Sequence, residues 1–134
     1  MKVPKEGTAL GDKTLDNMFQ AYQHRRSVYY VAEENEKILG CAGIAPLQNY
    51  DGNLCELQKM YVDSSFRGKG LATMLLKRCL ETAVTLEFEG CYLETLPSMR
   101  AAQQLYQKMG FHYIKDALGD TGHTACSVRM LKNF

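Results

Sequence analysis

The segment 61–72, with the sequence YVDSSFRGKGLA, constrains the fold of this chain more than any other stretch. It follows a run of strand-forming residues, contains Gly68 and Gly70, and passes directly into a helical pattern. Glycines at this point let a ligand approach the main chain, and a helix beginning there points its unpaired N–H groups at that ligand. The segment therefore predicts a site for phosphate or pyrophosphate, with Arg67 and Lys69 adding positive charge.

Length and composition favour one domain over the whole chain. The 134 residues are 46% hydrophobic and 23% charged, with 16 basic and 15 acidic residues and a net charge of +1. This balance gives no reason to expect binding to nucleic acid or to an anionic membrane. Because the sequence shows neither a signal-peptide pattern nor an apolar run of transmembrane length, we expect a soluble, cytoplasmic protein with a single domain spanning residues 1–134.

The five cysteines are scattered, with no C-x-x-C spacing, and therefore predict neither a disulfide framework nor a metal site. Apolar neighbours favour buried thiols that act as small hydrophobic side chains. A nucleophilic role for Cys91 or Cys126 is disfavoured, because neither has an evident base nearby in the sequence. We expect no metal.

Hydrophobic periodicity gives an order of helix, strand, strand, strand, helix, strand, helix, strand and strand. The strand–helix–strand unit after residue 54 implies one parallel strand pair with a right-handed crossover, and the hairpins imply antiparallel neighbours. The result is a mixed α/β domain. The expected helices cover residues 16–23, 70–87 and 97–109, and the expected strands cover residues 27–32, 38–47, 54–62, 91–96, 111–114 and 125–131.

Two motifs make the chain resemble the GNAT acyltransferases. The run RGKGLA, ending at Ala72, fits the R/Q-x-x-G-x-G/A signature of that family, and the run from Ala102 to Phe111 fits its A-x-x-L-Y-x-x-x-G-F signature. Both occur in the expected order, with a strand–helix–strand unit between them, and together they cover residues 54–114. The resemblance implies a mostly antiparallel mixed sheet, flanked by helices, with one splayed pair of parallel strands.

The resemblance also implies the role of each site residue. The strand end that would hold the pantetheine of acetyl-CoA, the co-substrate, comprises Met60, Tyr61 and Val62. The main-chain N–H groups that would bind its pyrophosphate belong to Arg67, Gly68, Lys69, Gly70, Leu71 and Ala72. Tyr106 falls where many members carry the tyrosine that protonates the departing thiolate, and Glu56 falls where several carry a general base. Amine attack on a thioester needs both a base and an acid.

Other readings of these residues remain open from the sequence. Tyr106 could be a core residue on a helical stripe, and Glu56 could face solvent beside Gln58. Imperfect alternation in this strand allows a bulge near Met60 that redirects side chains. His123 could approach an amine from its loop, although a surface role is the commoner one. Some of the tyrosines could line an acceptor pocket: Tyr29, Tyr30 and Tyr50.

Two departures from the family pattern stand out. Met99 occupies a position where many members carry an asparagine, so one side-chain contact to the coenzyme is in doubt. The segment before residue 14 is too short and irregular to supply the strand and helix with which the family begins, so we expect both to be missing. Either the sequence is truncated relative to the native chain, or the strand 28–32 is an open edge that pairing with a second subunit in a homodimer would cover.

The leading functional hypothesis is an N-acetyltransferase that moves acetyl from acetyl-CoA to an amine of a small molecule or peptide, by direct attack in a ternary complex. The alternative is a non-catalytic acyl-CoA sensor or interaction module. A nucleotide site is disfavoured, because no G-x-x-x-x-G-K-[ST] motif is present. The sequence does not identify the acceptor amine.

Overall fold

The computed structural model describes residues 19–24, 26–120 and 128–134. The strands and helices that it describes follow the order β1 (Phe19–His24), β2 (Ser27–Glu34), β3 (Lys37–Pro46), β4 (Leu54–Val62), the 3-10 helix η3 (Ser64–Phe66), α1 (Leu71–Thr85), β5 (Gly90–Thr95), α2 (Arg100–Lys108), β6 (His112–Ile114) and β7 (Val128–Asn133). Across these residues, no helix has the length and apolar character that crossing a bilayer requires.

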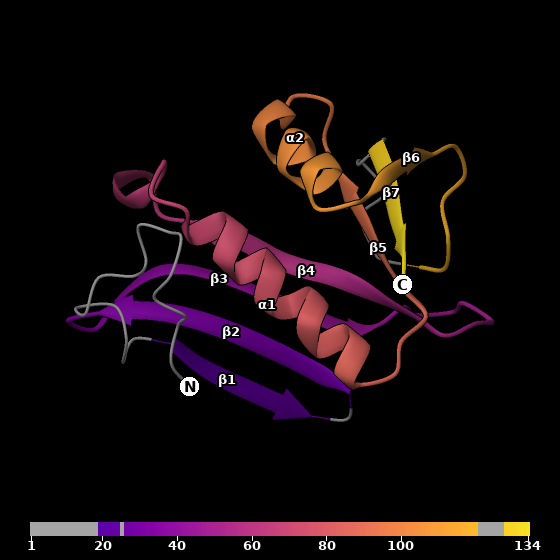
Figure 1. The fold of residues 1–134 in the computed structure, drawn as a ribbon, viewed down its shortest axis with the longest axis horizontal. Helices are drawn as coiled ribbons and strands as arrows, with labels where there is room; N and C mark the ends of the chain where they lie inside the picture. The colour runs from indigo at the N-terminus through magenta and orange to yellow at the C-terminus, as the bar shows by residue number, and fades with distance from the viewer. Residues whose placement is uncertain (1–18, 25, 121–127) are drawn as a thin grey trace.

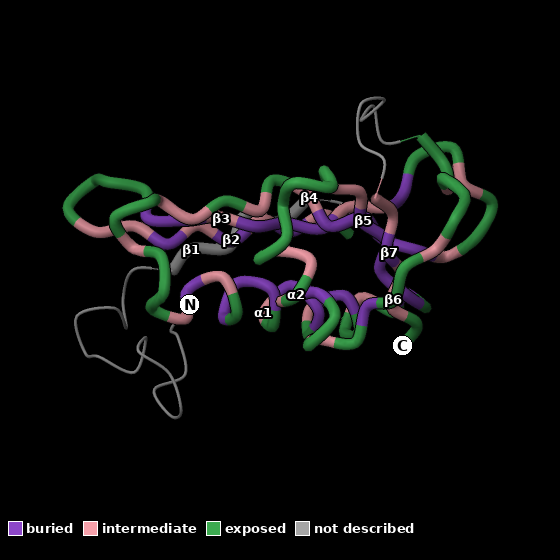
Figure 2. The backbone as a smooth tube through the Cα atoms, turned by 90° about the horizontal axis from the view of Figure 1, so that it is seen from above, coloured by how far each residue is buried: buried purple, intermediate pink, exposed green. Residues whose placement is uncertain are grey.

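The strands form one sheet in the order β1-β2-β3-β4-β5-β7-β6. Pairing is antiparallel everywhere except between β4 and β5, which are parallel and are joined by α1 (Figure 1). Seen edge-on, the sheet makes one layer, and both α1 and α2 lie on the same side of it (Figure 2). The expected mixed, mostly antiparallel architecture with one parallel pair is confirmed.

The main core lies between α1 and the sheet. The leucine and cysteine stripes of α1 are buried against alternate residues of β2, β3, β4 and β5, as its periodicity predicts. We call this side of the sheet the helix face. A smaller cluster of Leu47, Leu54 and Tyr92 lies on the other side, which we call the opposite face.

The structure corrects the helix expected over residues 16–23. Residues 19–24 form strand β1, which pairs antiparallel with β2 from Phe19 to His24, and residues 16–18 lie outside the described part of the chain. A segment this short gains little from helical hydrogen bonds alone, whereas a tight connection to β2 offers it a complete ladder. Spacing of apolar residues over eight positions did not distinguish the two states.

β1 also changes where the sheet ends. The edge expected on residues 28–32 of β2 is covered by β1, so the prediction of an open edge there was wrong. Within the described residues the outer strands are β1 and β6. Homodimerisation stays a prediction, and an edge-to-edge contact on this side would use β1 rather than β2.

Candidate functional site

The first component of the site is a gap between the two parallel strands. β4 and β5 pair at only three positions, from Leu54 opposite Gly90 to Glu56 opposite Tyr92. β4 nevertheless continues to Val62 and β5 to Thr95. Beyond Glu56, the side of β4 that points toward β5 therefore has no strand partner among the described residues. The splayed parallel pair expected from the sequence is present.

A bulge shapes the same part of β4. The register between β3 and β4 shifts by one residue between Cys41 and Gly43, and Lys59 adopts a positive φ of 55° at that point. An extra residue reverses the alternation of side chains beyond it. As a result, Met60 and Val62 pack against the core on the helix face, whereas Glu56 does not. The bulge allowed near Met60 is confirmed, and it does redirect the side chains.

The second component is the turn that precedes α1. Gly68 and Gly70 have φ values of 77° and 81°, a left-handed conformation that favours glycine, and Gly70 is the N-cap of α1. A Cβ added at Gly68 would meet nothing within 4 Å, so the turn is open on that side. Within the described residues, no backbone N–H from Arg67 to Thr73 donates to a backbone carbonyl. The turn therefore presents free donors at the positive end of a helix.

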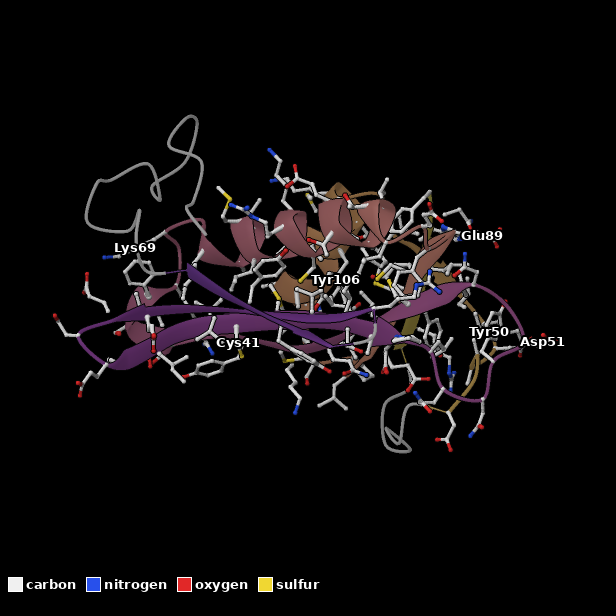
Figure 3. The ribbon with its side chains drawn as sticks, turned by 90° about the horizontal axis from the view of Figure 1, so that it is seen from below. Cys41, Tyr50, Asp51, Lys69, Glu89 and Tyr106 are labelled. Carbon is white, nitrogen blue, oxygen red and sulfur yellow. The ribbon has the colours of Figure 1, made fainter. Side chains whose placement is uncertain are left out.

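The charged side chains of this turn are exposed. The Lys69 ammonium lies 5.1 Å from the centre of the Phe66 ring, and Arg67 is open to solvent. Figure 3 shows Lys69 beyond the N-terminal end of α1, far from Tyr50 and Asp51 at the other end of the sheet. The turn thus combines two exposed positive charges with unpaired main-chain donors, which suits a polyanionic ligand.

Tyr106 is the third component. It lies on α2, is only 5% exposed, and occupies the helix face of the sheet (Figure 3). Its ring packs against Phe111 at 5.8 Å between centroids. Burial, followed by the nearby Cys91, raises the pKa of Tyr106 to about 12. Among the described residues, none hydrogen-bonds to its hydroxyl, so the group is a protonated and unengaged donor.

The neighbouring thiols do not compete for a chemical role. A hydrogen bond with Cys55, together with burial, raises the pKa of Cys91 well above its usual range, and burial raises the pKa of Cys79 to about 12. Both groups therefore stay protonated at neutral pH, and a protonated thiol is a poor nucleophile. The prediction that Cys91 is structural fits this environment, whereas Cys126 and His123 lie outside the described residues.

Glu56 lies across the sheet from Tyr106. It is 2% exposed, and its register partner is Tyr92 of the opposite-face cluster, so the reading of a solvent-facing carboxylate is wrong. Gln58 Nε2 donates to Glu56 Oε1 at 2.8 Å, and the Tyr29 hydroxyl donates to Gln58 Oε1 at 2.5 Å. Burial, followed by the charge of Glu56, raises the pKa of Tyr29. Hydrogen bonds thus orient a buried carboxyl group at the point where β4 and β5 separate.

Gly43 makes this arrangement sterically feasible. Its partner across β3 and β4 is Gln58, and a Cβ added at Gly43 would lie 2.0 Å from Cδ1 of the Tyr29 ring. The ring therefore lies directly over the β3 main chain, where it reaches Gln58. Of the three tyrosines considered for an acceptor pocket, only Tyr29 contacts this network. Tyr30 is buried on the helix face with its hydroxyl 2.5 Å from Thr82 Oγ1, and Tyr50 packs beside the opposite-face cluster.

Further polar residues lie on the opposite face that the sequence did not single out. The Tyr92 hydroxyl donates to Glu94 Oε2 at 2.5 Å and accepts from the Leu118 N–H at 3.2 Å. Burial, followed by the hydrogen bond to Glu94, raises the pKa of Tyr92 to about 12. Arg129 of β7 lies opposite Glu94 in the register. Residues two positions apart in a strand share a face, so the spacing of Tyr92 and Glu94 in β5, like that of Glu56 and Gln58 in β4, was a signal available from the sequence.

The chain is similar to proteins of a known family. The model of the Acetyltransferase (GNAT) family matches residues 4–111. The uncharacterized N-acetyltransferase YjgM of Escherichia coli (strain K12) is 42% identical over 96% of this chain and 77% of its own length. An N-acetylaspartate synthetase of Xenopus tropicalis is 35% identical over 66% of this chain, but the chain spans only 32% of that protein.

Solved structures share the fold. An acetyltransferase of the GNAT family from Staphylococcus aureus Mu50 superimposes with a TM-score of 0.70 and 27% identity, over 81% of this chain and 68% of that one. An N-acetyltransferase of Thermoplasma acidophilum in complex with coenzyme A gives a TM-score of 0.64 at 16% identity, over 81% and 61% of the two chains. With the family model covering most of its length, the chain belongs to the GNAT family of acetyltransferases.

Proposed function

We propose that this protein transfers an acetyl group from acetyl-CoA to a primary amine of a small molecule or peptide, by direct attack in a ternary complex. The observation that carries the proposal is the gap between β4 and β5, with the Tyr106 hydroxyl on the helix face and the Glu56 carboxyl group on the opposite face. A thioester held in this gap would have a proton donor on one side and a proton acceptor on the other.

The coenzyme would bind along two main-chain surfaces. The free N–H groups from Arg67 to Ala72 would take the pyrophosphate, in front of the N-terminus of α1. The unpaired side of β4, at residues Met60 to Val62, would hydrogen-bond the pantetheine as a neighbouring strand does. Met99, half-exposed at the N-cap of α2, would add no side-chain hydrogen bond. Main-chain groups therefore supply most of the binding in this proposal.

The chemistry needs no covalent intermediate on the protein. The amine nitrogen attacks the thioester carbonyl carbon and forms the new C–N bond, and Glu56 accepts the proton that the nitrogen loses, directly or through water. Collapse of the tetrahedral adduct breaks the C–S bond, and the Tyr106 hydroxyl gives its proton to the departing sulfur. Holding both substrates in one cleft provides much of the rate enhancement.

A thiol-release assay tests this function. Purified protein is incubated with acetyl-CoA and a panel of amines, including polyamines, N-terminal peptides and amino acids. Aspartate belongs in the panel, because several relatives are named N-acetylaspartate synthetases. Amine-dependent release of free coenzyme A, with an acetylated product by mass spectrometry, is expected. Tight coenzyme binding without release for any amine would instead support an acyl-CoA sensor.

The substitution Gly68→Ala tests the turn. The added Cβ meets no protein atom within 4 Å, so it would enter the space in front of the donors, and the positive φ costs about 1 kcal/mol of stability. We expect the Kd for coenzyme A to rise by about tenfold or more, which corresponds to about 1.4 kcal/mol. Isothermal titration calorimetry measures this change.

The matched control for that variant is Gly110→Ala. Gly110 also has a positive φ, of 99°, lies outside the turn, and a Cβ there would meet only the flexible side chain of Lys132. It should lose stability without a change in Kd. An unchanged affinity in Gly68→Ala would contradict pyrophosphate binding at this turn.

A further inference from the structure

Arg129 places a positive charge on the same face of the sheet as Glu56. It lies on β7 directly opposite Glu94, while its neighbour Met130 is buried on the helix face. Cross-strand partners project to the same side, so the Arg129 side chain shares the opposite face with Glu94 and Tyr92. The Arg129 Nη1 donates to the Lys115 carbonyl oxygen at 3.3 Å, which brings the guanidinium under the loop that follows β6.

One donor of this guanidinium is buried and unused. Of the buried side-chain nitrogen and oxygen atoms in the described residues, only Arg129 Nε has no hydrogen-bond partner. Buried donors of a charged group are normally paired, because leaving one unpaired costs on the order of 1–3 kcal/mol. Its register partner Glu94 accepts a hydrogen bond from the Tyr92 hydroxyl and accepts none from Arg129 Nε. The orphaned donor therefore indicates a ligand of opposite charge.

The register places Arg129 within reach of the proposed reaction centre. Glu56 pairs with Tyr92 of β5, and β5 pairs in turn with β7. Arg129 lies two residues along β7 from Leu131, the partner of Tyr92. Two interstrand spacings and this offset put the backbones of Glu56 and Arg129 on the order of 12 Å apart, before the arginine side chain extends between them. A small molecule whose amine lies beside Glu56 could thus reach the guanidinium with a second group. Arginine is suited to bind a carboxylate through two parallel hydrogen bonds.

We propose that the acceptor amine also carries a carboxylate and that Arg129 binds it, which makes Arg129 a specificity-determining residue. This inference rests on the proposed acetyltransferase function, because it assumes that the acceptor occupies the opposite face beside Glu56. The substrate class is then amino acids and related carboxylated amines. Carboxyl-free polyamines are excluded as preferred substrates.

The test compares matched acceptors with wild-type protein and variants. L-Aspartate, L-glutamate and L-alanine are each assayed with acetyl-CoA against the corresponding carboxamides. We expect the best acid to exceed its amide by at least tenfold in kcat/KM. Arg129→Gln should remove most of this preference by raising KM for the acid, with little change in the Kd for coenzyme A. Arg129→Lys should restore part of it.

A structural role is separated by stability and by a charge control. Removing Arg129 loses its hydrogen bond to the Lys115 carbonyl but also removes the orphaned Nε donor, so the melting temperature should change little, whereas a large fall would indicate that Arg129 supports the fold. Arg129→Met provides a second variant of similar length. Lys77→Gln removes one exposed positive charge from α1 and should change neither the preference for acids over amides nor the melting temperature.

Binding measurements test the role of Arg129 independently of the acetyltransferase function. The same acids and amides are titrated by calorimetry into the coenzyme A complexes of wild-type and Arg129→Gln protein. Binding of an acid that needs Arg129, without any turnover, would support the inference and contradict the acetyltransferase function. Turnover of amines without regard to the carboxyl group, or acid preference unchanged in Arg129→Gln, would overturn the inference alone. If the protein shows no turnover and no binding that depends on Arg129, both the inference and the acetyltransferase function are overturned.

Discussion

Replacing Tyr106 by phenylalanine is expected to lower kcat by about 100-fold, the lower range for loss of a positioned proton donor. The ring packing against Phe111 is retained, so neither the fold nor the coenzyme cleft should change. Only the hydroxyl is lost, and it has no hydrogen bond to another described residue to disrupt. Steady-state kinetics and a coenzyme A titration should therefore show a fall in kcat at constant Kd.

The control for this variant is Tyr113→Phe. Tyr113 is exposed, and its hydroxyl donates to Gln103 Oε1 at 2.9 Å on the outside of the domain. Loss of that hydroxyl should leave kcat within about twofold, as expected for a surface substitution. An equal effect of both substitutions, or full activity in Tyr106→Phe, would show that Tyr106 does not protonate the thiolate.

The pKa of Tyr106 gives a related expectation for pH. Because burial raises it to about 12, the phenol stays protonated through the assay range and should produce no alkaline loss of activity below about pH 11. Because the folded state holds this proton more tightly than the unfolded state, the shift also affects the free energy of unfolding. The contribution of Tyr106 to that free energy is complete below about pH 10 and is lost as the pH rises toward 12.

Replacing Glu56 by glutamine should lower kcat/KM at neutral pH by about 100-fold, because the side chain keeps its shape but can no longer accept a proton from the amine. The loss should shrink as the pH rises toward the pKa of the acceptor, since the free amine is then already deprotonated. A pH–rate profile of the variant measures this recovery, which removal of a purely structural carboxyl group would not produce.

The matched control removes a carboxylate elsewhere. Glu89 is exposed and lies beyond the C-terminal end of α1, far from Tyr106 (Figure 3). Glu89→Gln should leave the profile unchanged. If Glu56→Gln keeps wild-type activity at neutral pH, the base is a different group or a chain of water molecules.

The elements that the sequence predicted well are those with a local signal. The stripe of Leu71, Leu75 and Cys79 defines α1, and the glycines at positions 68 and 70 mark its start, because periodicity and backbone conformation depend on near neighbours. The separation of β4 from β5 followed from the resemblance of these motifs to a family. For the N-terminal segment, the deciding factor was its ladder with β2, which no residue within the segment reports.

The opposite face was harder to predict, because it is assembled from strands distant in sequence. Tyr29 reaches Gln58 only because Gly43, on a third strand, has no side chain. Arg129 approaches Glu94 only through the register of β5 with β7. Neither contact has a periodic signature, so the sequence placed Gln58 beside Glu56 but did not predict that Tyr29 holds Gln58. Long-range register is set by the folded sheet and is not encoded in any single segment.

The short β4–β5 ladder has a mechanical consequence. Three residue pairs hold the block of β5, β7 and β6 against β1 to β4 along their shared border, so the sheet is nearly divided in two. A pantetheine arm bound between the diverging ends of β4 and β5 would bridge the two halves of the sheet. Binding of acetyl-CoA would then make the sheet more rigid where the acceptor binds, which favours an ordered mechanism in which acetyl-CoA binds before the acceptor.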